Sequence, residues 1–93
     1  MARFVVQWVY SEDRDARLAA RPEHRLHLGS LAERGVVLAA GPLGDDSGGI
    51  VVFEAADVTE LQGYLDADPY TKAGVIVKTT VTEWNPVLGA WVG

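Results

Sequence analysis

Four short stretches of strand-forming residues, interrupted twice by helical patterns, constrain the fold of this chain more than any other feature. Val, Ile, Phe, Tyr and Trp are frequent in these stretches, and such residues favour strands. The predicted strands cover residues 4–10, 36–40, 50–54 and 75–82. A helical pattern follows the first strand and another follows the third, so the order is β-α-β-β-α-β. Two right-handed crossovers around a short hairpin predict an α+β, ferredoxin-like fold, in which an antiparallel four-stranded sheet carries both helices on one face.

An apolar stripe defines the first helix. His24, Leu28, Leu31 and Gly35 recur at helical spacing, and a glycine just past the last turn favours a left-handed cap. Pro22 fits the first turn of this helix, where a missing N–H costs nothing. The residues just before Pro22 fit either a loop or a helical lead-in. The stripe turns His24 toward the sheet, one turn before Leu28.

The second helix is predicted at residues 58–67. Asp57 precedes it as an N-cap, and leucines four residues apart give it an apolar face. Asp68 and Pro69 end it, because a proline restricts the residue before it to extended conformations. Residues 43–49, rich in glycine and aspartate, are interpreted as the flexible hairpin connection between the second and third strands.

The length of 93 residues favours one domain, residues 1–93. Helices cover only one face of the predicted sheet, yet apolar residues point to both faces of its first and last strands. Hydrophobic residues make up 48% of the chain, and the aromatic surface of Trp84 and Trp91 lies in a tail outside the predicted core. The sheet of a second copy is the simplest cover, so the sequence predicts a homodimer.

Composition excludes several classes of protein. The net charge is −5, with eight basic and thirteen acidic residues and no basic run, so nucleic acid is not an expected partner. There is no cysteine, which excludes disulfides and thiol catalysis. No apolar stretch approaches the roughly 20 residues that span a bilayer, and no signal peptide is apparent. The expected location is therefore the cytoplasm.

His24 and Asp68 are the candidate groups for proton transfer. An imidazole can carry a proton at neutral pH, and a carboxylate can orient it. A buried imidazole also needs a hydrogen-bond partner. Each residue has a structural alternative: His24 can be a core histidine with its bonds satisfied, and an Asp-Pro pair at a helix end is ordinary turn chemistry.

The chain resembles the YCII-related (YciI-like) family from its first strand to about residue 88. The resemblance rests on an ordered set of short motifs: Arg21-Pro22-Glu23-His24, then Gly35, then Gly41-Pro42-Leu43, then Asp68-Pro69-Tyr70. It implies a dimeric α+β barrel. It also implies that Asp68 pairs with His24 as a dyad, in which the carboxylate sets the imidazole tautomer. The predicted topology permits this pairing, because it brings the start of the first helix and the end of the second to one end of the helical layer.

Five further residues are predicted substrate contacts, each with a structural alternative. Tyr70 would close a pocket and offer a hydroxyl, or would simply pack. Gly41 and Pro42 would shape the pocket wall, or would only end the second strand. Arg21 would bind an anionic group, or would be a solvated helix residue. Ser47 would contact substrate, or would only belong to the flexible glycine-rich connection.

No metal site and no cofactor are predicted. Asp45, Asp46 and Glu54 lack the company of other metal ligands. The glycine-rich connection carries no Gly-Lys-Ser/Thr motif, and its two aspartates would repel phosphate.

These observations favour a cofactor-free, dimeric enzyme of lyase or isomerase type. His24 would act as general base or acid on a small polar molecule, cyclic or phenolic, and Asp68 would orient it. The resemblance includes relatives that look like halide-eliminating enzymes of aromatic degradation. The alternative is a non-catalytic small-ligand sensor or accessory dimer module, since a fold does not fix a function.

Overall fold

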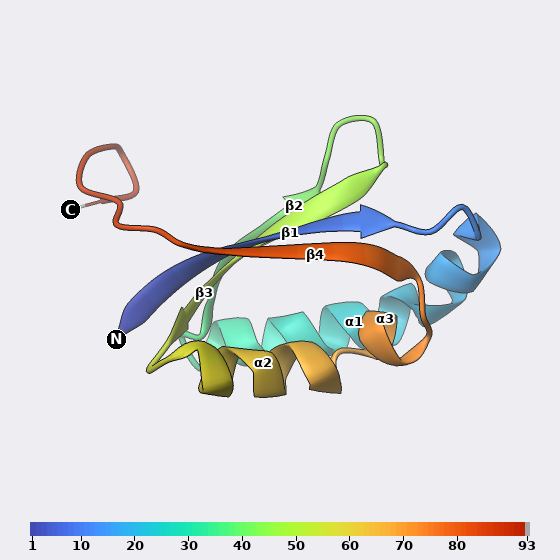
Figure 1. Ribbon diagram of the computed structural model, residues 1–93, viewed down its shortest axis with the longest axis horizontal. Helices are drawn as coiled ribbons and strands as arrows, with labels where there is room; N and C mark the ends of the chain where they lie inside the picture. The colour runs from blue at the N-terminus through green and yellow to red at the C-terminus, as the bar shows by residue number, and fades with distance from the viewer. Residues whose placement is uncertain (93) are drawn as a thin grey trace.

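The computed structural model describes residues 1–92 and shows the predicted α+β architecture. Its elements are β1 (Ala2–Tyr10), α1 (Arg14–Glu33), β2 (Val37–Pro42), β3 (Gly48–Ala55), α2 (Val58–Ala67), α3 (Pro69–Lys72) and β4 (Ile76–Glu83). The four strands form one sheet in the order β2-β3-β1-β4, with every neighbouring pair antiparallel. All three helices lie on one side of this sheet (Figure 1). The predicted ferredoxin-like fold is therefore confirmed.

The core lies between the sheet and the helices. Phe4, Val6 and Trp8 alternate along β1 and are buried on its helical side, as the period of two in a strand requires. They pack with Leu28 and Leu31 of α1 in one cluster of buried apolar side chains. The same cluster holds both inward-facing leucines of α2, so one apolar layer joins the sheet to the two longer helices.

Helix α1 begins earlier than the sequence predicted. Asp13 caps it by accepting a hydrogen bond from the amide of Ala16 at 3.0 Å, and Pro22 lies inside the helix. The placement of Pro22 in the first turn was wrong, and the lead-in alternative holds. An internal proline removes only one backbone hydrogen bond, and the residues before it include three alanines, good helix formers that extend the helix back to its cap. As a result, Arg17 and Arg21 share a helix with His24.

Both helix ends predicted from capping residues are present. Gly35 has a φ of 75° after α1, and the next amide, that of Val36, donates to the carbonyl of Leu31 at 2.8 Å, as in a Schellman cap. Helix α2 ends at Ala67. The Asp68-Pro69 pair then begins the short helix α3, which the sequence analysis treated as a turn.

The other face of the sheet is open. Val9, near the end of the inner strand β1, is 45% exposed, and Leu38 is equally exposed. The tail after β4 begins with a backbone hydrogen bond from Trp84 to Arg3 at 2.9 Å, and Trp91 near its end is 89% exposed. In Figure 1 this tail continues past the end of β4 and curls into a loop, and its residues share a hollow with Leu38, Ala39 and Val52 of the sheet. The single chain therefore leaves Val9, Leu38 and Trp91 at least partly uncovered.

Candidate active site

His24 and Asp68 are in direct contact. His24 projects from α1 toward the start of α3, and its Nδ1 lies 2.7 Å from Oδ1 of Asp68. Both residues are buried, with exposed fractions of 7% and 1%. Helix α3 packs against α1, which brings together two residues that are distant in the sequence. A charge-assisted hydrogen bond of this length is strong.

Asp68 is held in place by a second bond. Its Oδ1 also accepts a hydrogen bond from the backbone amide of Tyr70 at 2.9 Å, so Asp68 is the N-cap of α3. An ionised carboxylate only accepts hydrogen bonds. Nδ1 of His24 then carries the hydrogen of the shared bond, and its Nε2 keeps the free lone pair.

Aromatic rings fix the plane of the imidazole. The ring of Tyr70 stacks on that of His24, with a centroid separation of 3.6 Å and an interplanar angle of 4°. Trp8 approaches from β1 at 5.7 Å and 60°, and Tyr10 meets Tyr70 edge-on at 5.9 Å. His24 is thereby confined between an aromatic wall and a carboxylate.

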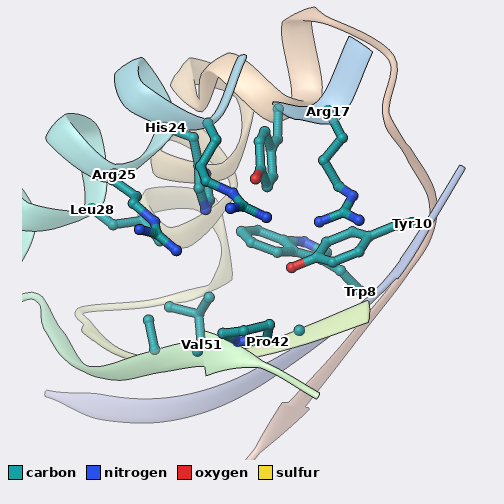
Figure 2. Close-up of a pocket in the computed structure, with 13 residues that line it drawn as sticks. Trp8, Tyr10, Arg17, His24, Arg25, Leu28, Pro42 and Val51 are labelled. Carbon is teal, nitrogen blue, oxygen red and sulfur yellow. The ribbon is translucent and has the colours of Figure 1, made fainter. Parts of the chain in front are cut away.

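A cavity of about 260 Å³ opens beside His24. It lies between α1 and the sheet, and Figure 2 shows the labelled side chains of α1 reaching into it above Pro42 and Val51. Among the residues predicted as substrate contacts, Tyr70, Gly41, Pro42 and Arg21 line it. Asp68 lies behind His24 and does not line it.

Ser47 does not line this cavity. It precedes β3, and its hydroxyl donates to Oδ1 of Asp45 at 2.6 Å. Its backbone carbonyl accepts from the amide of Tyr10. The Ser47 hydroxyl thus stabilises the turn between β2 and β3. Ser47, predicted as a substrate contact, lies outside the cavity.

Arg17 belongs to the site although the sequence analysis did not single it out. Its side chain is buried and makes two hydrogen bonds to Asp46, at 3.3 and 2.7 Å. The guanidinium also lies over the ring of Tyr10, 4.4 Å from its centroid. The hydrogen bond from Arg17 lowers the pKa of the Asp46 carboxyl. A signal for Arg17 was present in the sequence: Arg17, Arg21 and Arg25 are four residues apart, which places them on one face of a helix. The signal depends on a helix that starts before Arg17, and the predicted helix started later.

Tyr10 offers a neutral hydroxyl to the cavity. Burial is the main reason why the pKa of its phenol is raised, so the group is protonated at neutral pH and can donate a hydrogen bond. It lies against β3, where a Cβ added at Gly49 would come within 2.7 Å of the hydroxyl oxygen. Gly49 is therefore required for this position of Tyr10.

Residues 1–92 contain no group of three or more His, Asp or Glu side chains that could hold a metal ion. Within the same residues, no helix is both long enough and apolar enough to cross a bilayer.

The chain is thus a small α+β protein of ferredoxin-like fold, with a buried histidine–aspartate pair beside a small cavity. The model of the YCII-related domain matches residues 2–85, and the chain belongs to this family. Its relatives include the proteins named YciI of Escherichia coli O6:H1 (strain CFT073) and Shigella flexneri. Each is 31% identical over an alignment that covers 85% of this chain and 95% of the relative.

Solved structures show the same fold. The 5-chloro-2-hydroxyhydroquinone dehydrochlorinase TftG of Burkholderia phenoliruptrix AC1100, in complex with 2,5-dihydroxybenzoquinone, superposes with a TM-score of 0.79. It is 24% identical, over 89% of this chain and 93% of its own. Rv0793 of Mycobacterium tuberculosis gives a TM-score of 0.59 at 12% identity, over 96% of this chain and 97% of its own. An antibiotic biosynthesis monooxygenase gives 0.59 at 15% identity, over 95% and 100%. At these identities the likeness shows a shared fold.

Proposed function

We propose that this protein is a lyase or isomerase that works without a cofactor on a small polar ring compound. His24 is the general base and acid, and Asp68 orients it. The observation that carries the proposal is the 2.7 Å contact between the buried side chains of His24, which lines the cavity, and Asp68, which lies behind it. A carboxylate bonded to Nδ1 holds the imidazole in one orientation and one tautomer.

The proton path follows from the hydrogen bonds. Nε2 of His24 takes a proton from the substrate, and the electron pair of the broken bond stays on the substrate. In a lyase that pair expels a leaving group, which departs with its own bonding electrons. In an isomerase the proton returns from Nε2 to a different atom of the same molecule. The carboxylate of Asp68 stabilises the imidazolium that forms between these steps.

The cavity suits a small ring. Its volume of about 260 Å³ lies below the roughly 300–1,000 Å³ of pockets for drug-sized ligands. Trp8, Tyr10 and Tyr70 give it aromatic walls, and Tyr10 and Tyr70 each offer a hydroxyl. A hydroxylated ring is also what the name of TftG describes as its substrate.

A direct assay uses 5-chloro-2-hydroxyhydroquinone, from which dehydrochlorination removes one proton and one chloride ion. We expect enzyme-dependent chloride release, followed with a chloride electrode. In D2O we also expect enzyme-dependent exchange of a ring hydrogen for deuterium, seen by NMR, on this or a related hydroxylated ring. Ligand binding without proton exchange or chloride release on any ring of such a panel would contradict the enzymatic proposal.

One observation favours a second candidate, a non-catalytic small-ligand-binding or accessory dimer module. Asp68 already has a structural task as the N-cap of α3, so its contact with His24 does not by itself require catalysis. Such a module would bind the same rings in the same cavity. Its ligands would leave unchanged, which the deuterium experiment detects.

We propose further that two copies pair through the open face of the sheet. Sedimentation velocity at micromolar concentration should give a species of twice the 10.0 kDa chain mass. For scale, obligate interfaces often exceed about 2,000 Å². Placing a charge on this face with Val9→Lys should shift the protein toward monomer. Leu26→Lys is the matched control, because Leu26 is 74% exposed on the outer side of α1. The protein with this substitution should remain a dimer. A stable 10.0 kDa species of the unmodified chain would contradict the pairing.

A further inference from the structure

Three arginines stand on the cavity side of α1. Arg17, Arg21 and Arg25 are four residues apart and all line the cavity. Figure 2 shows Arg17 and Arg25 reaching toward it from the helix, on either side of His24. No Asp or Glu is among the lining residues. A chain with a net charge of −5 thus presents a cationic wall at its candidate active site.

Only one of these three charges is neutralised. Arg17 is bound by both oxygens of Asp46 and covered by Tyr10. Arg21 and Arg25 have no carboxylate within 4.0 Å in the described part of the chain, where four ion pairs are formed. Asp46 is engaged by Arg17 and lies 3.9 Å from Nε of Arg14. Two guanidinium groups are therefore left for a ligand.

The spacing of these arginines along α1 favours the binding of an anion. Like charges at i and i+4 on a helix destabilise it, so Arg21 and Arg25, which have no carboxylate partner, repel each other along α1. A negative group in the cavity would relieve this repulsion. The planar guanidinium groups also match the two oxygens of a carboxylate. His24 lies between Arg21 and Arg25 on the same helix, so an anion held there would place its ring beside the imidazole.

We infer that the ligand of this cavity is an anionic ring compound, and that Arg21 and Arg25 bind its acidic oxygen. The inference deepens the proposed function by naming the charge class of the substrate. The inference rests on the proposed function only for the role of His24, because an anion can bind to Arg21 and Arg25 whether or not the protein turns it over. Arg17 is a positioning residue, because it holds Tyr10 and the turn that contains Asp46.

The test compares two probes of nearly the same shape, of which only the first carries a negative charge: 2,5-dihydroxybenzoate and 2,5-dihydroxybenzamide. Isothermal titration should show that the unmodified protein binds the acid at least about tenfold more tightly than the amide, as expected for hydrogen bonds to a charged group. The double variant Arg21→Gln with Arg25→Gln should lose this preference. Arg21→Lys with Arg25→Lys should keep part of it, because the charge remains.

Arg34→Gln is the control. This exposed arginine lies after the end of α1 and outside the cavity. Its replacement removes one positive charge without changing any residue that lines the cavity. Its preference for the acid should match that of the unmodified protein. Equal affinity for acid and amide, no binding of the acid at millimolar concentration, or an unchanged preference in the double glutamine variant would overturn the inference. Acid binding through the arginines with no turnover of any ring would leave the inference standing and remove the enzymatic proposal.

Discussion

Replacing His24 with asparagine should lower turnover of the ring substrate by about 100- to 10,000-fold, the usual contribution of general acid–base catalysis. The amide nitrogen of asparagine can take the place of Nδ1 and donate to Asp68, whose Oδ1 lies 2.7 Å away. No atom of asparagine replaces Nε2, so the proton acceptor is lost while the buried carboxylate keeps its partner. The measurement is kcat/KM by chloride release, with circular dichroism to show that the variant is folded.

His27→Asn is the matched control. His27 is the other histidine of the chain and lies three residues further along α1, but it does not line the cavity. Its Nε2 lies 3.1 Å from the carbonyl of Tyr64. Turnover of this variant should stay within about twofold of the unmodified protein, since the effect of a distant polar substitution is small. Full activity of His24→Asn, or an equal loss in both variants, would remove His24 from the chemistry.

The fold was predictable because its signals are local and repeated. Strand-forming stretches and helical spacing act within a few residues, and they specify the order β-α-β-β-α-β. The start of α1 was not predicted correctly, because two local signals compete there. Pro22 suggests a first turn, while Asp13 supplies a cap eight residues earlier than a start at that proline would need. The cap prevails, since one missing hydrogen bond does not outweigh two further turns of helix.

The site was predictable only in part. The spacing of Leu28 and Leu31 turns His24 inward, and that orientation follows from the helix alone. Its contact with Asp68 depends on how α1 and α3 are rotated and offset, which no local pattern encodes. Only the family resemblance pointed to that pairing. Arg17 was missed for a related reason: an arginine on a helix is usually solvated, and its burial depends on Asp46, which is distant in the sequence.

Replacing Asp68 with alanine should lower the free energy of unfolding by about 1.5–5 kcal/mol. The change removes the N-cap of α3, which costs about 0.5–2 kcal/mol, and leaves Nδ1 of the buried His24 without a partner, which costs about 1–3 kcal/mol. Urea unfolding followed by tryptophan fluorescence measures this. Asp57→Ala is the control, since Asp57 caps α2 through the amide of Glu60 at 2.8 Å but has no buried partner. It should lose only the capping contribution.

Asp68→Asn separates the two tasks of this carboxylate. Its amide oxygen can still accept from the amide of Tyr70 and from His24, so both bonds to Oδ1 survive. Its amide nitrogen takes the place of Oδ2, which is buried without a protein partner, so the stability loss should be near 1 kcal/mol. The negative charge that stabilises the imidazolium is absent, however, and turnover should fall even though the fold persists. If Asp68→Asn kept full turnover, Asp68 would serve only as the cap of α3, and the non-catalytic binding module would be favoured.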